Sequence, residues 1–471
     1  MKILKFGGTS LQNANRVNQT TDIIRQRTEN DSKLAVVVSA FAGVTDLLIS
    51  AAQNAAAGDE SYKTIVQTLE DIHLNIAQKS LSVQNQSRAL AKIVSSLNDL
   101  HDVLHGVFLV RELSARVLDF VMSFGERLSA FIVTEVLKEK GVNAEYLDAR
   151  QVIKTNDHFG QAAVLWDETN EKIQRLFKNK QKLLVITGFI ASTKQNETTT
   201  LGRSGSDFTA SIFGAALDVE EIQIWTDVDG VMTADPRKVS SAFSIPQITY
   251  EEAMELSHFG AQVIHPRTMQ PALEKKIPIR IKNTLNPQHP GTVISDQSNN
   301  WPWSIRGLTS LDSIALVSVI GSGMIGVTGI AGRVFSALAR EKINIILISQ
   351  ASSEHSICFA VLPEYSLQAK NALEKELKLE LIERTVNKVI VEDNLSIIAV
   401  VGEKMRRTRG IAGKVFSSLG QHGINIVAIA QGSSERNISF VIDRKDLTNA
   451  LNAIHSEFFK HQAENNREVK K

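Results

Sequence analysis

The sequence predicts an α/β protein with two regions: a first domain with a mainly parallel sheet, then two tandem copies of a small βαββα-type unit. From Met1 to about Ile294, short β-branched runs alternate with helical patterns, which is typical of a parallel sheet covered by helices. The second region repeats its own sequence at a fixed spacing. At 471 residues the chain is also long for a single core, so two or three domains are expected.

Short apolar runs bounded by turn or helix signals are the candidate strands of the first domain. They are Lys2–Phe6, Lys33–Ser39, Asn143–Asp148, Leu183–Gly188, Glu221–Thr226 and Ile279–Lys282. Between Thr64 and Leu118 the pattern is polar and helical, with no strand run inside it. We therefore expect a helical insertion at one edge of the sheet.

The repeat in the second region keeps one register over a long stretch. Gly329–Phe335 recurs as Gly410–Phe416, an offset of 410 − 329 = 81, and the same offset carries Gln350 onto Gln431. Each first helix follows a glycine-containing loop, where backbone N–H groups favour a carboxylate. The alternative is that the two copies are purely structural and bind no ligand. We expect residues 296–313 to form a connector between the domains, and we expect its two tryptophans to pack against the protein so that the connector is not flexible.

Composition restricts the classes of function. The 52 basic and 51 acidic residues give a formal net charge of +1, which argues against a dedicated binder of nucleic acid or of anionic membranes. The single Cys358 excludes an intrachain disulfide, and no apolar run approaches the roughly 18 residues of a membrane helix. Lys2 and Lys5 lie inside a strand, so the start does not resemble a signal peptide. We expect a cytoplasmic protein.

The first strand runs directly into Gly7 and Gly8, a pattern that can hold phosphate. Glycines allow a close backbone approach to an anion, Lys5 supplies a positive charge, and Ser10 could cap the next helix, expected over Leu11–Arg27. An ordinary tight turn is the simpler interpretation of this pattern alone.

Further polar groups lie at expected strand ends or helix starts. Gly202–Asp207 combines two glycines with an arginine and a carboxylate, and Glu126 is expected just before an amphipathic helix. Trp225–Gly230 ends a strand with two carboxylates, and Asp235–Arg237 follows. Each alone is more simply a turn. Together with the glycine turn they supply the parts of a phosphoryl-transfer site: a cradle for an anion, a clamp for a carboxylate, an acceptor for an ammonium group and contacts for a nucleotide.

These motifs resemble, in order and over nearly the whole chain, the aspartokinase family. They are KFGGTS from Lys5, SAFAGVT from Ser39, FGE ending at Glu126, GRSGSD from Gly202, WTDVDG from Trp225, DPR from Asp235 and FGAQVIHPRT from Phe259. The resemblance implies a three-layer αβα amino-acid-kinase domain over residues 1–295. Two ferredoxin-like βαββαβ ACT domains would follow, over residues 314–392 and 393–465. It further implies ATP and Mg²⁺ as cofactors, L-aspartate as substrate and a homodimer or larger oligomer.

The resemblance also implies roles for matching positions, none of them as a metal ligand. Catalysis would involve Lys5 and Asp207. Aspartate would contact Ser39, Thr45, Glu126, Arg203 and Ser206. The nucleotide would contact Lys5, Phe6, Gly7, Gly8, Thr226, Asp227, Met232, Arg237, Gln262 and Val263. An amino-acid effector, threonine or lysine, would contact Gln350, Asn425 and Gln431.

Two positions depart from the family pattern. Met232 replaces a usual tyrosine and Gln262 a usual lysine, both on the nucleotide side. The second copy resembles the threonine-responsive aspartokinases that are fused to homoserine dehydrogenase, although we expect no dehydrogenase segment after the repeats. The alternatives are a catalytically weakened amino-acid sensor and another amino-acid kinase, for instance one acting on glutamate.

Overall fold

The computed structural model describes residues 1–30, 33–178, 180–259, 265–297, 301–324, 327–350 and 356–468. The chain divides into two compact units. The first unit comprises Met1–Val231, Ser244–Tyr250 and Val263–Ser298, and the second comprises Met232–Phe243, Glu251–Gln262 and Asn299–Lys471. Within the described residues, no helix is both long and apolar enough to cross a membrane.

An eight-stranded sheet forms the centre of the first unit, in the order β3-β4-β2-β1-β7-β9-β10-β8. All neighbouring strands are parallel except β9 and β10, so the predicted mainly parallel sheet is confirmed. The strands are β1 (Lys2–Phe6), β2 (Leu34–Val38), β3 (Ala144–Leu147), β4 (Leu183–Thr187), β7 (Glu221–Thr226), β8 (Gln247–Thr249), β9 (Ile279–Asn283) and β10 (Thr292–Ser295). All six strand predictions are confirmed; β8, β10 and the hairpin of β5 (Ile190–Ser192) and β6 (Thr198–Thr200) were not predicted.

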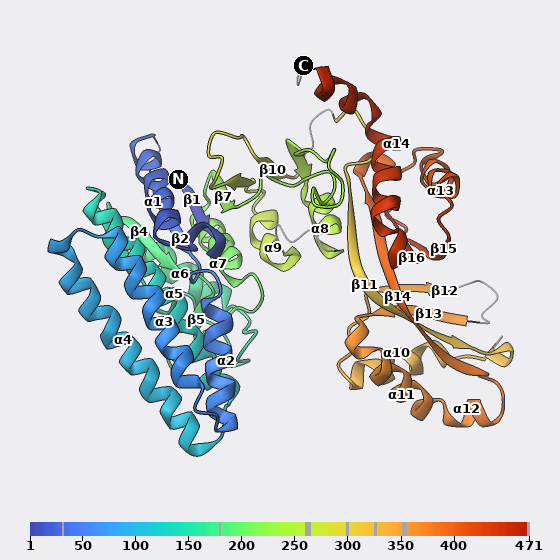
Figure 1. Cartoon of the computed structure of the whole chain (residues 1–471), viewed down its shortest axis with the longest axis horizontal. Helices are drawn as coiled ribbons and strands as arrows, with labels where there is room; N and C mark the ends of the chain where they lie inside the picture. Colours follow the sequence, from blue (N-terminus) through green and yellow to red (C-terminus); the bar gives the residue numbers. More distant parts are fainter. Residues whose placement is uncertain are drawn as a thin grey trace. The chain divides into compact units, whose positions relative to one another are not determined.

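Helices cover both faces of this sheet, as the three-layer expectation requires (Figure 1). Successive side chains of a strand point to opposite faces. Leu4 and Phe6 of β1 belong to the core shared with α1 and with α2 to α5. Lys5 points the other way, toward α7. The helices of this unit are α1 (Ala14–Asn30), α2 (Val44–Ala57), α3 (Tyr62–Ser80), α4 (Val83–Val110), α5 (Ala115–Glu139), α6 (Trp166–Phe177), α7 (Gly205–Leu217) and α9 (Pro266–Glu274), whereas α8 (Tyr250–His258) belongs, except for its first residue, to the second unit.

The predicted helical insertion is confirmed as α3, α4 and the start of α5. The expectation that a helix begins just after Glu126 is wrong, because α5 begins at Ala115, where the Ser114 side chain accepts a hydrogen bond from the N–H of Val117. Gly125 suggested a turn, but it lies inside the helix. A Cβ there would lie 2.8 Å from the Cβ of Ala40, so this glycine permits close packing.

The helix after the glycine turn also starts later than predicted. Residues Gly8–Leu11 form a short 3-10 helix, and α1 begins at Ala14. The Asn13 side chain accepts from the N–H of Arg16 at 3.1 Å, so Asn13 caps α1 in place of Ser10. The Ser10 hydroxyl instead lies 2.7 Å from that of Thr284.

The second unit contains a six-stranded sheet in the order β12-β13-β11-β14-β16-β15, with antiparallel neighbours throughout. Its elements are β11 (Gly307–Ile320), α10 (Ile330–Arg340), β12 (Leu347–Gln350), β13 (Ser356–Val361), α11 (Ser366–Glu376), α12 (Lys378–Ile382), β14 (Lys388–Val401), α13 (Ile411–Gln421), β15 (Ile426–Gln431), β16 (Asn437–Asp443) and α14 (Leu447–Glu468).

The two long strands β11 and β14 join the repeated copies. They pair along their length, from Gly307 opposite Val401 to Ile320 opposite Lys388. Each copy therefore gains a fourth strand from the other copy, which confirms the expected βαββαβ arrangement. Gly329 and Gly410 adopt left-handed φ values of 95° and 85° before α10 and α13, so the equivalence of the copies extends to their helix caps.

The last residues of the expected 296–313 connector lie in β11, which begins at Gly307. The tryptophans before it pack down, as expected. Trp301 is buried, its indole N–H donates to the carbonyl of Ile305 at 2.7 Å, and its ring meets that of Trp303 at 4.8 Å between centroids.

Candidate functional site

The glycine turn lies at the carboxyl end of β1, where parallel α/β sheets usually bind ligands. The N–H of Gly7 donates to the carbonyl of Trp225 at 3.2 Å, and that of Ser39 donates to the carbonyl of Phe6 at 3.1 Å. A Cβ at Gly8 would lie 3.1 Å from the carbonyl oxygen of Ala40. The ends of β1, β2 and β7 are therefore held together around this turn.

Lys5 and Asp207 form an ion pair beside this turn. The Lys5 Nζ lies 2.6 Å from Asp207 Oδ1, and both side chains are about nine-tenths buried. Asp207 is in the first turn of α7, where the helix dipole favours a carboxylate. The pair joins the first strand to the helix layer on one face of the sheet. Two predicted catalytic residues are thus in contact.

Glu126 approaches from the helix layer on the other face. Its side chain is 3% exposed, and Oε1 accepts the N–H of Ala40 at 3.1 Å. Oε2 is buried without a hydrogen-bond partner among the described residues. Burial raises the pKa of Glu126 to about 8, partly offset by the N–H of Ala40 and the charge of Lys5. A buried carboxylate with one vacant oxygen is suited to an ammonium group.

The segment after β2 connects these groups. The hydroxyl of Ser129, one turn beyond Glu126, donates to the carbonyl of Ser39 at 2.7 Å. Ser39 is half-buried, and so is Thr45 in the first turn of α2. Gly43, with a left-handed φ of 77°, turns the chain into this helix. Ser39 therefore belongs to the loop that Glu126 binds, and Thr45 lies in the helix that begins directly after it.

Arg203 lies in the loop before α7, and Ser206 lies in the first turn of that helix. Arg203 is exposed and makes no hydrogen bond or ion pair with the part of the chain described. His265, whose pKa is lowered first by burial and then by the charges of Arg203 and Arg267, lies near this guanidinium. Ser206 is buried, and a Cβ at Gly188 would lie 2.6 Å from its Cβ. Gly188, which the motifs did not include, therefore makes room for Ser206.

The end of β7 carries the predicted nucleotide residues Thr226 and Asp227. The Thr226 hydroxyl donates to Asp227 Oδ1 at 3.1 Å, and Asp227 is exposed. The turn is held by two side chains that the sequence did not single out. Asp229 Oδ1 accepts from the amides of Asn283 at 2.8 Å and Asn286 at 3.2 Å. Asn283 is the last residue of β9 and Asn286 follows that strand, so their position at the same sheet edge was the available signal.

The other predicted nucleotide residues lie elsewhere in the chain. Met232, half-buried, and Arg237 belong to the second unit. The Arg237 side chain is exposed and pairs with Asp235 at 2.9 Å, which raises the pKa of the arginine. Gln262 and Val263 are outside the described residues.

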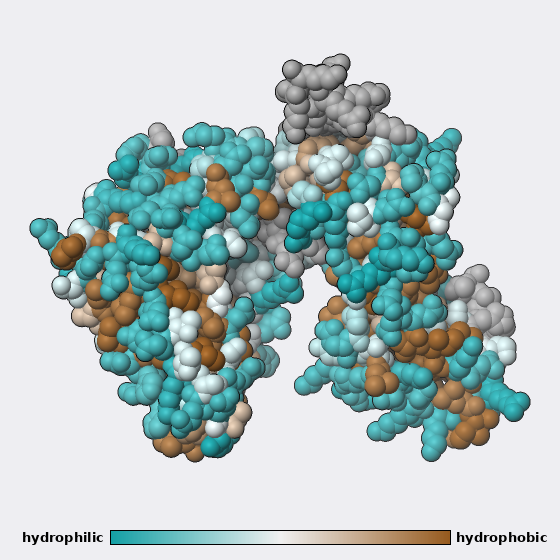
Figure 2. Space-filling view, viewed as in Figure 1, coloured by the Kyte–Doolittle hydropathy of each residue, from teal (hydrophilic) through white to brown (hydrophobic). Residues whose placement is uncertain are grey.

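The predicted effector residues are in the second unit. Gln350 ends β12 and Gln431 ends β15, and both are exposed, as is Asn425. These edge strands contact each other, since the Ser349 hydroxyl donates to the carbonyl of Ile429 at 2.9 Å. Apolar residues are also exposed here, namely Ile348, Val427 and Ile429. Figure 2 shows hydrophobic patches on the surface of this unit.

Comparison with known families agrees with this arrangement. Residues 1–283 match the amino acid kinase family, and residues 317–377 and 398–458 each match an ACT domain. The first match covers more than half of the chain. The chain therefore belongs to the amino acid kinase family.

Within that family, the similar proteins are aspartokinases. Aspartokinase 3 of Arabidopsis thaliana is 34% identical over 97% of this chain and 81% of its own length. A bifunctional aspartokinase/homoserine dehydrogenase of the same plant is 38% identical, and one of Buchnera aphidicola is 36% identical. The chain spans about half the length of these bifunctional relatives, 50% and 56% respectively.

Solved structures of the Escherichia coli aspartokinase III are similar along the whole chain. The complex with aspartate and ADP, in the R-state, has a TM-score of 0.81 at 30% identity and covers 98% of this chain and 100% of that one. The T-state complex with lysine and aspartate has a TM-score of 0.78.

Proposed function

We propose that this chain transfers the γ-phosphate of ATP to the β-carboxylate of L-aspartate, giving 4-phospho-L-aspartate and ADP. One observation carries the proposal: the Lys5–Asp207 ion pair and the unpartnered oxygen of Glu126 lie at the same edge of the sheet. A positive charge beside a glycine turn suits a transferring phosphate, and a buried carboxylate suits a substrate ammonium. The similar E. coli structure is a complex with aspartate and ADP.

In this proposal each side chain has one task. Glu126 binds the ammonium of aspartate, and the exposed guanidinium of Arg203 binds its α-carboxylate in a bidentate manner. The β-carboxylate is already ionised near neutral pH, so it needs positioning more than a general base. One of its oxygens attacks the γ-phosphorus while the bond to the ADP oxygen breaks. Lys5 neutralises charge that develops on the phosphoryl oxygens.

The remaining predicted residues complete the proposed site. Ser39, Thr45 and Ser206 contact aspartate. Phe6, Gly7, Gly8, Thr226, Asp227, Met232, Arg237, Gln262 and Val263 contact the nucleotide.

Mg²⁺ fits this site as a companion of the nucleotide. Mg²⁺ is usually bound through substrate phosphates, water and one or two carboxylates. Among the described residues there is no cluster of three or more potential metal ligands. Asp207, in contact with Lys5, is the carboxylate we assign to orient the bound ion, which neutralises phosphate charge when present.

The test is the release of ADP by the purified chain with ATP, Mg²⁺ and L-aspartate, with the acyl phosphate trapped as a hydroxamate. We expect aspartate-dependent ADP and hydroxamate in equal amounts. If aspartate produces no ADP, the chain is the weakened sensor, and if glutamate is the better acceptor, the substrate assignment is wrong.

We further propose that an amino acid, threonine or lysine, regulates the kinase through the ACT domains. Gln350, Asn425 and Gln431 would contact the effector, and the exposed Ile348, Val427 and Ile429 suit pairing with a second copy. The similar T-state structure contains lysine. Calorimetric titration with threonine, lysine and methionine, with the oligomeric state measured in parallel, tests both parts.

Contacts within the second unit support a coupling between the ACT domains and the nucleotide-binding segment. The segment Met232–Phe243, which carries Arg237, is bound by the regulatory elements. The carbonyl of Thr233 accepts from the N–H of Leu308 in β11 at 2.7 Å, and its hydroxyl lies 2.9 Å from Nε2 of the buried His455 in α14. A nucleotide-binding segment held this way would respond to movement of the ACT sheet.

The enzyme would catalyse the first step toward lysine, threonine and methionine, and we propose the cytoplasm as its compartment. We propose domain limits of 1–295, 314–392 and 393–465, with a connector over 296–313.

A further inference from the structure

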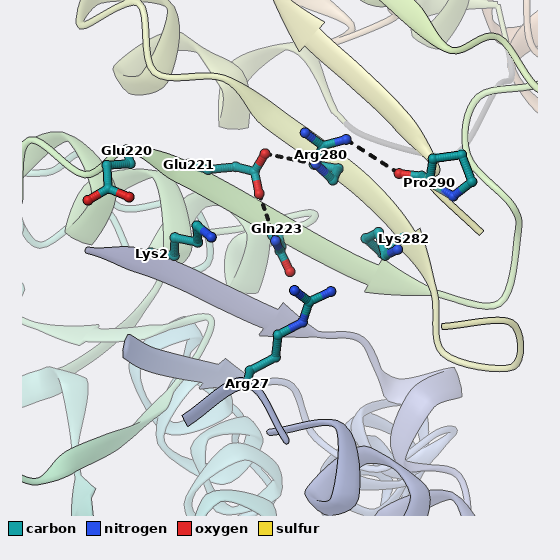
Figure 3. Close-up of a pocket in the computed structure, with 8 residues that line it drawn as sticks. All are labelled: Lys2, Arg27, Glu220, Glu221, Gln223, Arg280, Lys282 and Pro290. Atoms are coloured by element: carbon teal, nitrogen blue, oxygen red, sulfur yellow. Dashed lines mark hydrogen bonds and ion pairs between the residues drawn. The ribbon is translucent and has the colours of Figure 1, made fainter. Parts of the chain in front are cut away.

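A cationic pocket extends along one face of the sheet, starting at the strand ends opposite the glycine turn. It has a volume of about 420 Å³ and is lined by residues of β1, β7 and the neighbouring β9, from Lys2 and Glu221 at the starts of their strands to Lys282 near the end of β9 (Figure 3). Lys2 pairs in register with Glu221, and Gln223 with Arg280, so these side chains line one face of the sheet. Arg27, near the end of α1, reaches the pocket from the helix layer.

Positive charge exceeds negative charge in this pocket. Its wall has four cationic side chains, Lys2, Arg27, Arg280 and Lys282, against two carboxylates, Glu220 and Glu221. Glu221 is already engaged, because it accepts from Arg280 Nε at 2.8 Å and from the amide of Gln223 at 2.6 Å. Arg27 and Lys282 form no ion pair with a carboxylate of the described residues.

Lys282 is the most buried of these cations. It is 5% exposed, and the hydrogen bonds of its Nζ go to the carbonyl oxygens of Pro287, at 2.9 Å, and His289. Its pKa is lowered first by burial and then by the charges of Arg27 and Arg280, with Glu221 acting in the opposite direction. A buried ammonium crowded by two guanidinium groups is a costly arrangement that an anion would relieve.

Arg27 supplies free donors to the same space. Its guanidinium is half-buried, lies 5.9 Å from the ring centre of Trp225 and makes no hydrogen bond or ion pair with the residues that the structure describes. The Nζ of Lys282 lies 5.4 Å from the same ring. Both cations thus lie near the fully buried ring of Trp225, and the planar fork of Arg27 is free for a bidentate acceptor.

We propose that this pocket binds a small polyvalent oxyanion, either free phosphate or the phosphate group of a metabolite, between Arg27 and Lys282. The site differs from the proposed kinase site in its residues: Lys2, Glu221 and Arg280 lie in the amino-terminal halves of their strands and Arg27 near the end of α1, while Lys282 lies toward the carboxyl end of β9. It is connected to that site through one residue. The carbonyl of Trp225 accepts from the N–H of Gly7 and, at 3.3 Å, from the Ser10 hydroxyl.

The experiment is calorimetric titration of the full chain, in saturating ADP and aspartate, with inorganic phosphate, pyrophosphate or AMP. We expect Arg27→Gln to raise the Kd of the preferred anion about tenfold or more, the usual effect of losing a charge-assisted bidentate contact. Arg25→Gln is the matched control, since Arg25 is exposed on the same helix. It should change the Kd by less than about twofold.

A second variant separates charge from geometry. Arg27→Lys keeps the charge but loses the fork, so its Kd should lie between those of the wild type and Arg27→Gln. The order of affinities among the three anions distinguishes free phosphate from a phosphorylated metabolite. The proposal is overturned if the wild type binds none of them below about 10 mM. It is also overturned if Arg27→Gln binds as the wild type does, or if Arg25→Gln loses as much affinity.

Discussion

Glu126→Gln should remove the pH dependence of aspartate binding. The substitution keeps the size of the side chain and the acceptor for the N–H of Ala40, but it removes the negative charge that the proposed ammonium contact needs. The pKa of Glu126 is raised to about 8 by burial. In the wild type the carboxyl group is therefore mostly protonated at neutral pH until aspartate binds.

The size of the effect follows from that pKa. At pH 7 a group with a pKa of about 8 is ionised in roughly one molecule in ten. The kcat/KM for aspartate should rise about tenfold for each pH unit below about 8 and level off above it. Losing a charge-assisted bond to a buried ammonium costs about 2 to 4 kcal/mol, so Glu126→Gln should lower the plateau about 30- to 1000-fold.

The assay is the initial rate of ADP release at varied aspartate and saturating ATP, from about pH 6 to about pH 9. Glu135→Gln is the matched control, because Glu135 lies on the same helix and pairs with Lys138 at 2.7 Å. It should retain the wild-type pH profile. The reasoning fails if the wild-type profile is flat below pH 8, or if Glu126→Gln keeps the sloping limb.

Four further outcomes are expected. Lys5→Ala should lower kcat at least about 100-fold through loss of phosphoryl charge stabilisation, whereas Ala at the exposed Lys33 should leave kcat within about twofold; a mild effect at Lys5 would refute the cradle. Arg203→Ala should raise the KM for aspartate more than that for ATP, and an equal change in both would contradict its role. Gln262→Lys should lower the KM for ATP or raise kcat if the missing lysine is a deficit, and unchanged kinetics would show that it is not. Glu126 itself should contribute a loss of stability as pH rises from about 4.5 to about 8, because over that range the folded side chain holds a proton that the unfolded chain has released; the difference in free energy of unfolding between the ligand-free wild type and Glu126→Gln, measured with urea at each pH, should therefore change by up to about 1.4 kcal/mol per pH unit, and a constant difference would contradict the raised pKa.

The strands that the sequence predicted share one property. Runs such as Leu34–Val38 are buried at every position between two helix layers, so they are apolar throughout and easy to recognise. By contrast, β8 has three residues and β10 has four, and β10 is half-buried at alternate positions. Segments this short carry too little hydrophobic pattern to separate them from loops.

The site was predictable where its residues follow a strand, and less so elsewhere. Lys5, Ser39 and Thr226 lie at strand ends that a parallel sheet must bring to one edge. Glu126 was placed on the wrong kind of element because Gly125 resembles a turn signal. The contacts of Asn283 with Asp229 join segments distant in the sequence, and no local pattern specifies such a pair.

Gly8 and Gly125 of this site serve close packing and not an unusual backbone conformation. Gly7 has a φ of −75°, which any residue adopts. Gly8 and Gly125 both adjoin Ala40, where added Cβ atoms would lie 3.1 Å from its carbonyl oxygen and 2.8 Å from its Cβ, respectively. The N–H of the same residue binds Glu126, so two glycines from different layers fix the position of that carboxylate's partner. The anion cradle and the ammonium acceptor are thus positioned by one shared segment, the kind of support from neighbouring residues that a preorganised site requires.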